Sequence, residues 1–149
     1  MKIYISAQAL QKHEMETRLA AFSGDIVTHL LKLYLMPNHS ARNHWKQEVC
    51  AFLNEVVKLK GSKKYPTKEQ IYKWTYDKVQ DDVLDLDKMR RKLSGICEEY
   101  DIVPQDNVRN IMIDFDKQCV TYFRWLSAEL SKYGYVAPKS VYSKLDELF

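Results

Sequence analysis

The chain has 149 residues, of which 46% are hydrophobic and 29% are charged, and its formal net charge is +3. These values predict one globular domain over residues 1–149, and a charge this small does not by itself indicate nucleic acid binding. The three cysteines (Cys50, Cys97 and Cys119) are odd in number and far apart, which argues against a disulfide framework or a zinc site. The segment Met1–Ser6 lacks the apolar core of a signal peptide, and no apolar run is long enough to span a bilayer. We therefore expect a cytoplasmic protein with reduced thiols and no membrane contact.

Only 4 glycines and 4 prolines are present, so we expect few turns and long helices. The sequence does not decide whether residues 1–5 are ordered. Ser6 can cap a first helix, which should end near Met36 because Pro37 disfavours helical geometry in the residue before it. Gly24 lies inside this helix and permits a kink. The apolar stripe of this helix recurs every three or four residues: Leu19, Phe22, Ile26, Leu30 and Leu33.

A second helix is predicted from about Ala41 to Lys60, with Ser40 as its cap. Its apolar stripe consists of Trp45, Val49, Phe52, Val56 and Leu59. Gly61 should end this helix, and residues 61–66 read as a loop because Gly, Ser and Pro gather there.

Thr67 and Gln70 have the spacing of a capping box and predict the start of a long third helix that ends before Pro104. Its apolar stripe consists of Val79, Val83, Leu86, Leu93, Cys97 and Tyr100. Met89 or the aliphatic stem of Arg90 bridges the step from Leu86 to Leu93.

Asp106 should cap a fourth helix, which Gly134 ends, and Pro138 should begin a short last helix. The sequence thus predicts an all-α fold, an antiparallel bundle of four long helices with a short C-terminal helix.

An acidic run on the predicted third helix is either a solvated face or a docking patch for a basic partner. Asp81 and Asp85 lie one turn apart and could share a cation, but no histidine has ligand spacing and no glycine makes an EF-hand loop. We expect no metal site. The candidate partner-binding residues are Asp81, Asp82, Asp85, Asp87, Glu98 and Glu99.

A basic cluster surrounds Tyr65 in the loop after the second helix. Lysines can hold phosphates while an aromatic ring stacks on a base, so this cluster is a candidate nucleic acid site, although loop lysines also simply increase solubility. The residues of this alternative site are Lys60, Lys63, Lys64 and Tyr65.

His39 and His44 flank Arg42, and such a pair could act as general acid and base on a phosphodiester. The structural alternative is that they satisfy the helix ends at this corner. No serine or cysteine has a base at a recognisable motif spacing. We therefore expect no enzyme, no cofactor and no small-molecule substrate.

One part of the sequence, over about residues 14–60, resembles the central signature of an uncharacterised bacterial family catalogued as domain of unknown function twenty-nine. The residues that carry this resemblance are Glu16-Thr17-Arg18-Leu19, His29-Leu30-Leu31-Lys32, Pro37, Ser40 and Trp45.

The resemblance implies an all-α fold without an established enzymatic activity. Some similar small helical proteins are encoded beside secreted nuclease toxins, including the EndoU class, and look like immunity proteins of the kind used in contact-dependent growth inhibition. The leading hypothesis is therefore an immunity protein that neutralises a ribonuclease toxin by covering its active site in a one-to-one complex. The alternative is an RNA- or DNA-binding protein that uses the basic loop from Lys60 to Lys68.

Overall fold

The computed structural model describes residues 7–149, with side chains from Lys12 onward, and these residues form six α-helices. The helices are α1 (Ala7–Leu35), α2 (Arg42–Lys58), α3 (Lys68–Val83), α4 (Leu86–Tyr100), α5 (Val108–Tyr133) and α6 (Pro138–Leu148). No strand occurs among residues 7–149, so the all-α prediction is confirmed. Ser6, the expected cap of the first helix, lies outside the described residues.

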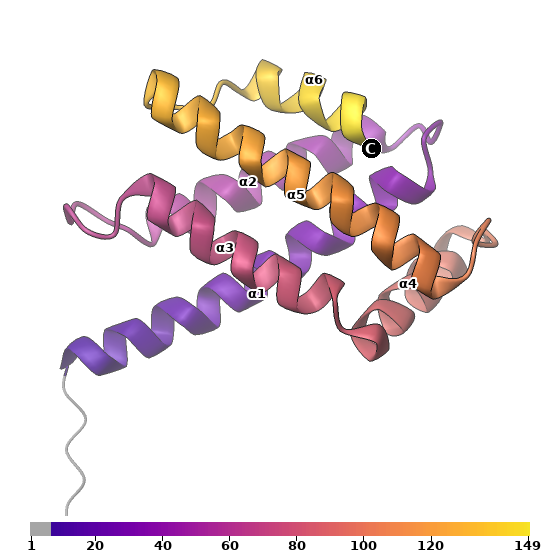
Figure 1. Ribbon diagram of the computed structural model, residues 1–149, viewed down its shortest axis with the longest axis horizontal. Coiled ribbons are helices and arrows are strands. Elements are labelled where there is room, and N and C mark those ends of the chain that lie inside the picture. Colours follow the sequence, from indigo (N-terminus) through magenta and orange to yellow (C-terminus); the bar gives the residue numbers. More distant parts are fainter. Residues whose placement is uncertain (1–6) are drawn as a thin grey trace, which may run out of the picture.

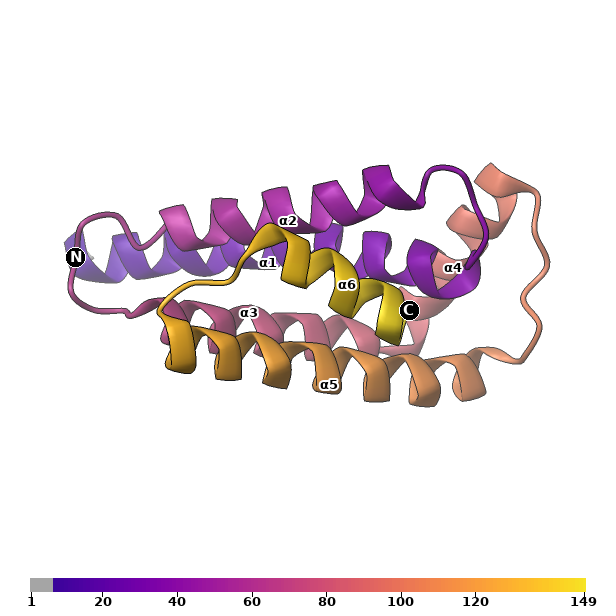
Figure 2. The ribbon, with the colours of Figure 1, turned by 90° about the horizontal axis from the view of Figure 1, so that it is seen from above.

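The helices are arranged as two pairs with two additional helices (Figures 1 and 2). The pair α1 and α2 runs antiparallel, and α3 and α5 form a second antiparallel pair that packs on the first through contacts of α3 with α1 and α2. Helix α4 closes one end of the bundle through contacts with α1, α3 and α5, and α6 lies over α2 and α5. Among residues 7–149, no helix is long and apolar enough to cross a membrane.

The predicted third helix is in fact two helices, α3 and α4, so the expected bundle of four long helices does not form. The break falls at Leu84 and Asp85, where the Asp85 backbone is extended and its side chain accepts a hydrogen bond from the Lys88 N–H at 3.1 Å. The break also changes which residues face the core, because Val83 and Met89 are both fully buried although a spacing of six residues does not place them on one helix face. The break between α3 and α4 therefore allows Met89 as well as Val83 to face the core.

Two predicted helix caps are wrong by one residue. Helix α2 begins after Ala41 rather than Ser40, and no side chain caps it in the usual manner; instead the Ala41 N–H donates to His39 Nδ1 at 3.0 Å. Helix α5 is capped by Asn107, whereas Asp106 accepts a hydrogen bond from the Asn107 N–H at 2.8 Å. At α5 the two adjacent residues accept from different N–H groups: Asp106 accepts from Asn107, and Asn107 accepts from Asn110 at 2.9 Å.

Three other signals at helix ends behave as predicted, whereas α2 ends at Lys58, before the predicted end near Lys60. Thr67 accepts a hydrogen bond from the Gln70 N–H at 3.2 Å, and Gly134 ends α5 in the left-handed conformation with φ of 75°. Pro138 is the first residue of α6, and α1 continues through Gly24 without interruption.

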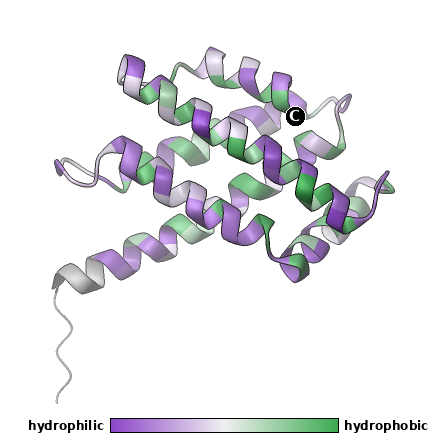
Figure 3. Cartoon of the chain, in the orientation of Figure 1, coloured by the Kyte–Doolittle hydropathy of each residue, from purple (hydrophilic) through white to green (hydrophobic). Residues whose placement is uncertain are grey.

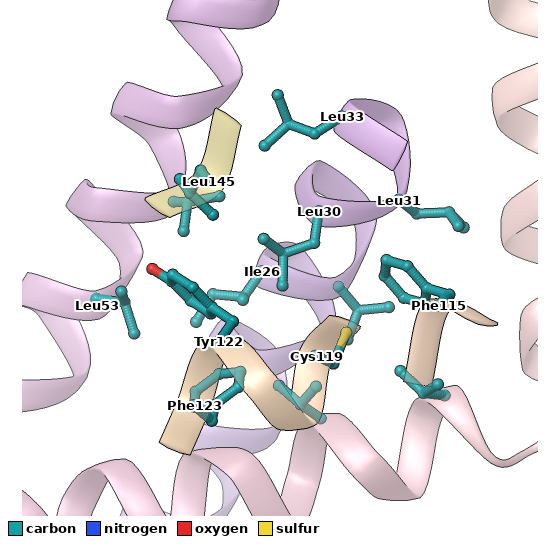
Figure 4. Packing of buried hydrophobic residues seen from close by; sticks show 14 of the residues in the cluster. Ile26, Leu30, Leu31, Leu33, Leu53, Phe115, Cys119, Tyr122, Phe123 and Leu145 are labelled. Carbon is teal, nitrogen blue, oxygen red and sulfur yellow. The ribbon is translucent and has the colours of Figure 1, made fainter. Parts of the chain in front are cut away.

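The hydrophobic core draws buried residues from all six helices. Figure 4 labels members of this core from α1, α2, α5 and α6. Along the helices, hydrophobic and hydrophilic positions alternate as expected for amphipathic helices (Figure 3). A polar contact adds to the core at the α1–α2 corner: the Arg42 guanidinium donates to the Leu33 carbonyl at 2.7 Å and pairs with Asp146 of α6 at 3.3 Å. Lys46 also pairs with Asp146, at 2.8 Å. Helix α6 is thereby attached to the corner through both apolar and charged contacts.

Candidate functional site

A groove of about 570 Å³ lies between the N-terminal half of α1, the loop before α3, and α3 itself. Figure 1 shows this half of α1 projecting away from α3 on the side where the loop lies. We call this feature the α1–α3 groove. Its lining residues are Lys12, Met15, Glu16, Leu19, Lys63, Tyr65, Pro66, Trp74, Asp77, Lys78 and Asp81.

The floor of the α1–α3 groove is apolar and partly open to solvent. Tyr65 is 66% exposed, and its ring packs edge-on against Trp74 with the ring centroids 6.2 Å apart. Met15 and Trp74 are half-buried, whereas Leu19 is fully buried. Large side chains that stay exposed on a helical framework form a surface typical of protein interfaces.

The rim of the α1–α3 groove carries three bases and three acids, so its formal charge is balanced. The bases are Lys12, Lys63 and Lys78, and the acids are Glu16, Asp77 and Asp81. A rim with both signs of charge favours a partner of mixed charge over a uniform polyanion or polycation.

The acidic residues predicted to bind a partner lie in different environments. Asp81 lines the α1–α3 groove. Asp82 pairs with Lys88 at 3.1 Å, and this hydrogen bond raises the pKa of Lys88. Asp85 is the cap of α4, and its carboxylate is thus engaged with the backbone. Asp87 is exposed at the start of α4.

Glu98 and Glu99 are exposed near the other end of α4. Along the helix they lie about 20 Å from Asp85, at about 1.5 Å per residue. The acidic residues therefore do not form one continuous helical face.

Two of the four residues of the predicted basic site line the groove. Lys63 and Tyr65 line it, Lys64 is exposed, and the Lys60 ammonium donates a hydrogen bond to the Lys63 carbonyl. The structure thus places members of both predicted sets, Tyr65 from the basic loop and Asp81 from the acidic run, in one groove.

Sequence reasoning missed most of the groove residues, namely Lys12, Met15, Glu16, Trp74, Asp77 and Lys78. A partial signal was present in α3. Trp74, Asp77, Lys78 and Asp81 follow the three- and four-residue steps of one helix face. No local pattern in the sequence indicates that this face of α3 lies opposite α1.

The side chains considered for catalysis make structural contacts. His39 stacks on Trp45 with centroids 4.9 Å apart, and His44 lies on the surface with Nε2 3.7 Å from Glu48. Burial raises the pKa of Cys50 to about 11, so its thiol stays protonated near neutral pH, whereas the thiolate is the reactive form. Among the described residues, no group of three or more His, Cys, Asp or Glu side chains is placed to hold a metal ion.

The fold and this site define the chain as an all-helical protein with an exposed, mixed-charge groove. No family model, no curated protein and no solved structure matches the chain.

Proposed function

We propose that this chain is a protein-binding module, and specifically an immunity protein that binds a secreted bacterial toxin of the ribonuclease class and covers its active site. The complex would contain one copy of each protein and form in the cytoplasm. The observation that carries the proposal is the α1–α3 groove, which combines an apolar aromatic floor with charges of both signs. The resemblance of residues 14–60 supplies the particular kind of partner.

The chemistry of the α1–α3 groove favours a protein over a nucleic acid as the partner. The carboxylates of Glu16, Asp77 and Asp81 line the same groove as Lys63 and would repel phosphate groups. Exposed tyrosine and tryptophan side chains, by contrast, commonly anchor protein interfaces. The basic loop therefore fits better as one edge of a protein-docking surface than as a nucleic acid track.

The contacts of the histidines favour a binding protein over a hydrolase. A general base must reach a substrate proton, but His39 Nδ1 already accepts the Ala41 N–H, and the ring lies against Trp45. The α1–α3 groove, rather than a catalytic histidine pair at this corner, is therefore the candidate functional site.

The test is to search the reading frames beside the gene for a secreted toxin and to mix the protein with the toxin domain found there; the absence of such a gene would count against the function. We expect a one-to-one complex in gel filtration and loss of the toxin's ribonuclease activity. Tyr65→Ala should weaken the complex by about 2 kcal/mol, roughly thirtyfold, because exposed aromatic anchors often dominate interfaces. Tyr135→Ala is the matched control, since Tyr135 is 63% exposed and lies in the α5–α6 connection outside the groove.

Two further results would count against this function. Absence of a complex together with undiminished toxin activity would overturn it. Retention of short RNA that weakens steeply with added salt would instead support the alternative nucleic acid binder.

A further inference from the structure

We propose that the α1–α3 groove receives an amphipathic α-helix of the partner, with two basic residues one turn apart on the flank that faces Asp77 and Asp81. This inference rests on the proposed function and specifies what the partner presents to the groove.

The shape of the groove fits a helix. The α1 wall presents residues 12, 15, 16 and 19, and the α3 wall presents residues 74, 77, 78 and 81. Each set follows steps of three and four residues, so each wall is one face of a helix. A third helix can set its own side-chain ridges between two such faces, as helices do in bundles.

The size of the groove also fits a helix. A volume of about 570 Å³ accepts several apolar side chains, which an amphipathic helix presents along two turns. Tyr65 and Trp74 supply the aromatic surface against which this apolar stripe would pack. The incoming helix would cover Tyr65, which is 66% exposed without a partner.

The charges of the two walls determine which flank of the helix is basic. On α1, Lys12 and Glu16 lie four residues apart and carry opposite charges. The α1 wall therefore has no net formal charge. On α3, Asp77 and Asp81 lie four residues apart and outnumber the single Lys78. Neither aspartate has an ion pair within the part of the chain that the structure describes.

Residues four apart on a helix have Cβ atoms about 6 Å apart. Two lysines or arginines at the same spacing on the incoming helix can therefore each face one of these aspartates. Such a basic flank is also compatible with a ribonuclease, whose surface must attract a polyanion.

The probes for the test are two synthetic helical peptides of about four turns. Both carry the same apolar stripe of leucines; one has lysines at positions i and i+4 on one flank, and the other has glutamates there. Binding to the full chain is measured by fluorescence anisotropy of a label on the peptide. We expect the lysine peptide to bind about tenfold more tightly, because two exposed ion pairs together give about that factor.

Charge reversal on the protein provides the decisive comparison. The double variant Asp77→Lys/Asp81→Lys should invert the preference, so that the glutamate peptide binds more tightly. Glu55→Lys/Glu147→Lys is the matched control: it makes the same change in net charge at exposed residues of α2 and α6 outside the groove and should keep the preference for the lysine peptide. Circular dichroism of each variant verifies that the helical fold is retained.

Equal binding of the two peptides, binding of neither, or an unchanged preference in the Asp77 and Asp81 variant would overturn this inference. The same variants in the toxin assay separate it from the proposed function. If the toxin complex forms and its affinity does not change on charge reversal at Asp77 and Asp81, the proposed helix in the groove is overturned but the immunity function is not. A charge-dependent peptide preference without any toxin complex supports the helix-binding groove and overturns the immunity function.

Discussion

Tyr122, in the middle of α5, is fully buried, and within the described part of the chain its hydroxyl oxygen has no hydrogen-bond partner. Its ring packs against Phe123, Trp125 and Phe149, with centroids 5.4, 6.2 and 6.3 Å away. Figure 4 shows this ring within the apolar cluster. Burial holds the pKa of the Tyr122 hydroxyl well above its usual value, so the group stays neutral.

The substitution Tyr122→Phe removes the oxygen and keeps the ring. A buried hydroxyl that has lost water without gaining a partner costs about 1–3 kcal/mol. The void left by one oxygen atom offsets only about 0.3 kcal/mol of this gain. We therefore expect the free energy of unfolding to increase by about 1 kcal/mol.

Urea unfolding followed by circular dichroism measures this change. The matched control is Tyr34→Phe, because the Tyr34 hydroxyl does have a partner and donates to Asp114 Oδ2 at 2.6 Å. Burial and this hydrogen bond raise the pKa of Tyr34 to about 12. The control should lower the free energy of unfolding by about 1 kcal/mol. A loss of similar size in Tyr122→Phe would refute the reasoning, since it would mean that the hydroxyl is hydrogen-bonded in solution.

Four further substitutions test particular features of the fold by urea unfolding. Asp85→Ala removes the cap of α4 and should cost about 1 kcal/mol; an unchanged midpoint would mean that the cap does not stabilise the break. The hydrogen bond from Lys46 lowers the pKa of Asp146 below its unfolded value of about 3.9, so its stabilising effect is present above that pH and lost as the pH falls through the folded pKa. Asp146→Asn should flatten this acid dependence, and identical pH profiles of variant and parent would contradict the pairing. Gly134→Ala should cost about 1 kcal/mol because φ is +75°, whereas Gly95→Ala, inside α4 with open space around it, should stabilise by a similar amount; equal effects of the two would disprove the conformational argument.

Most helix boundaries could be predicted from the sequence because their signals are local. Gly61 and Pro66 mark the loop before α3, Thr67 caps that helix, Gly134 ends α5 and Pro138 begins α6. Each of these effects depends on one residue and its immediate neighbours in the chain. Where two polar residues stand side by side, as Asp106 and Asn107 do, local rules place the boundary only to within one residue.

The division of the predicted third helix could not be derived from apolar spacing alone. Leu86 appeared to continue the stripe of Val79 and Val83, yet Met89 is the fully buried residue and Leu86 is only half-buried. Which of these side chains faces the core depends on contacts of α4 with α1 and α5. Asp85, a strong capping residue, was the local sign of the break.

The sequence by itself determined that this chain is helical and where most helices begin and end, because periodicity and capping act within a few residues. Only the tertiary structure decided that Lys12 and Met15 on α1 meet Tyr65 and Asp81 in one groove. These residues are far apart along the chain, and they converge because α1 extends past its crossing with α3 while the loop folds back onto Trp74. The docking surface is a consequence of helix packing, which no single amphipathic stripe encodes.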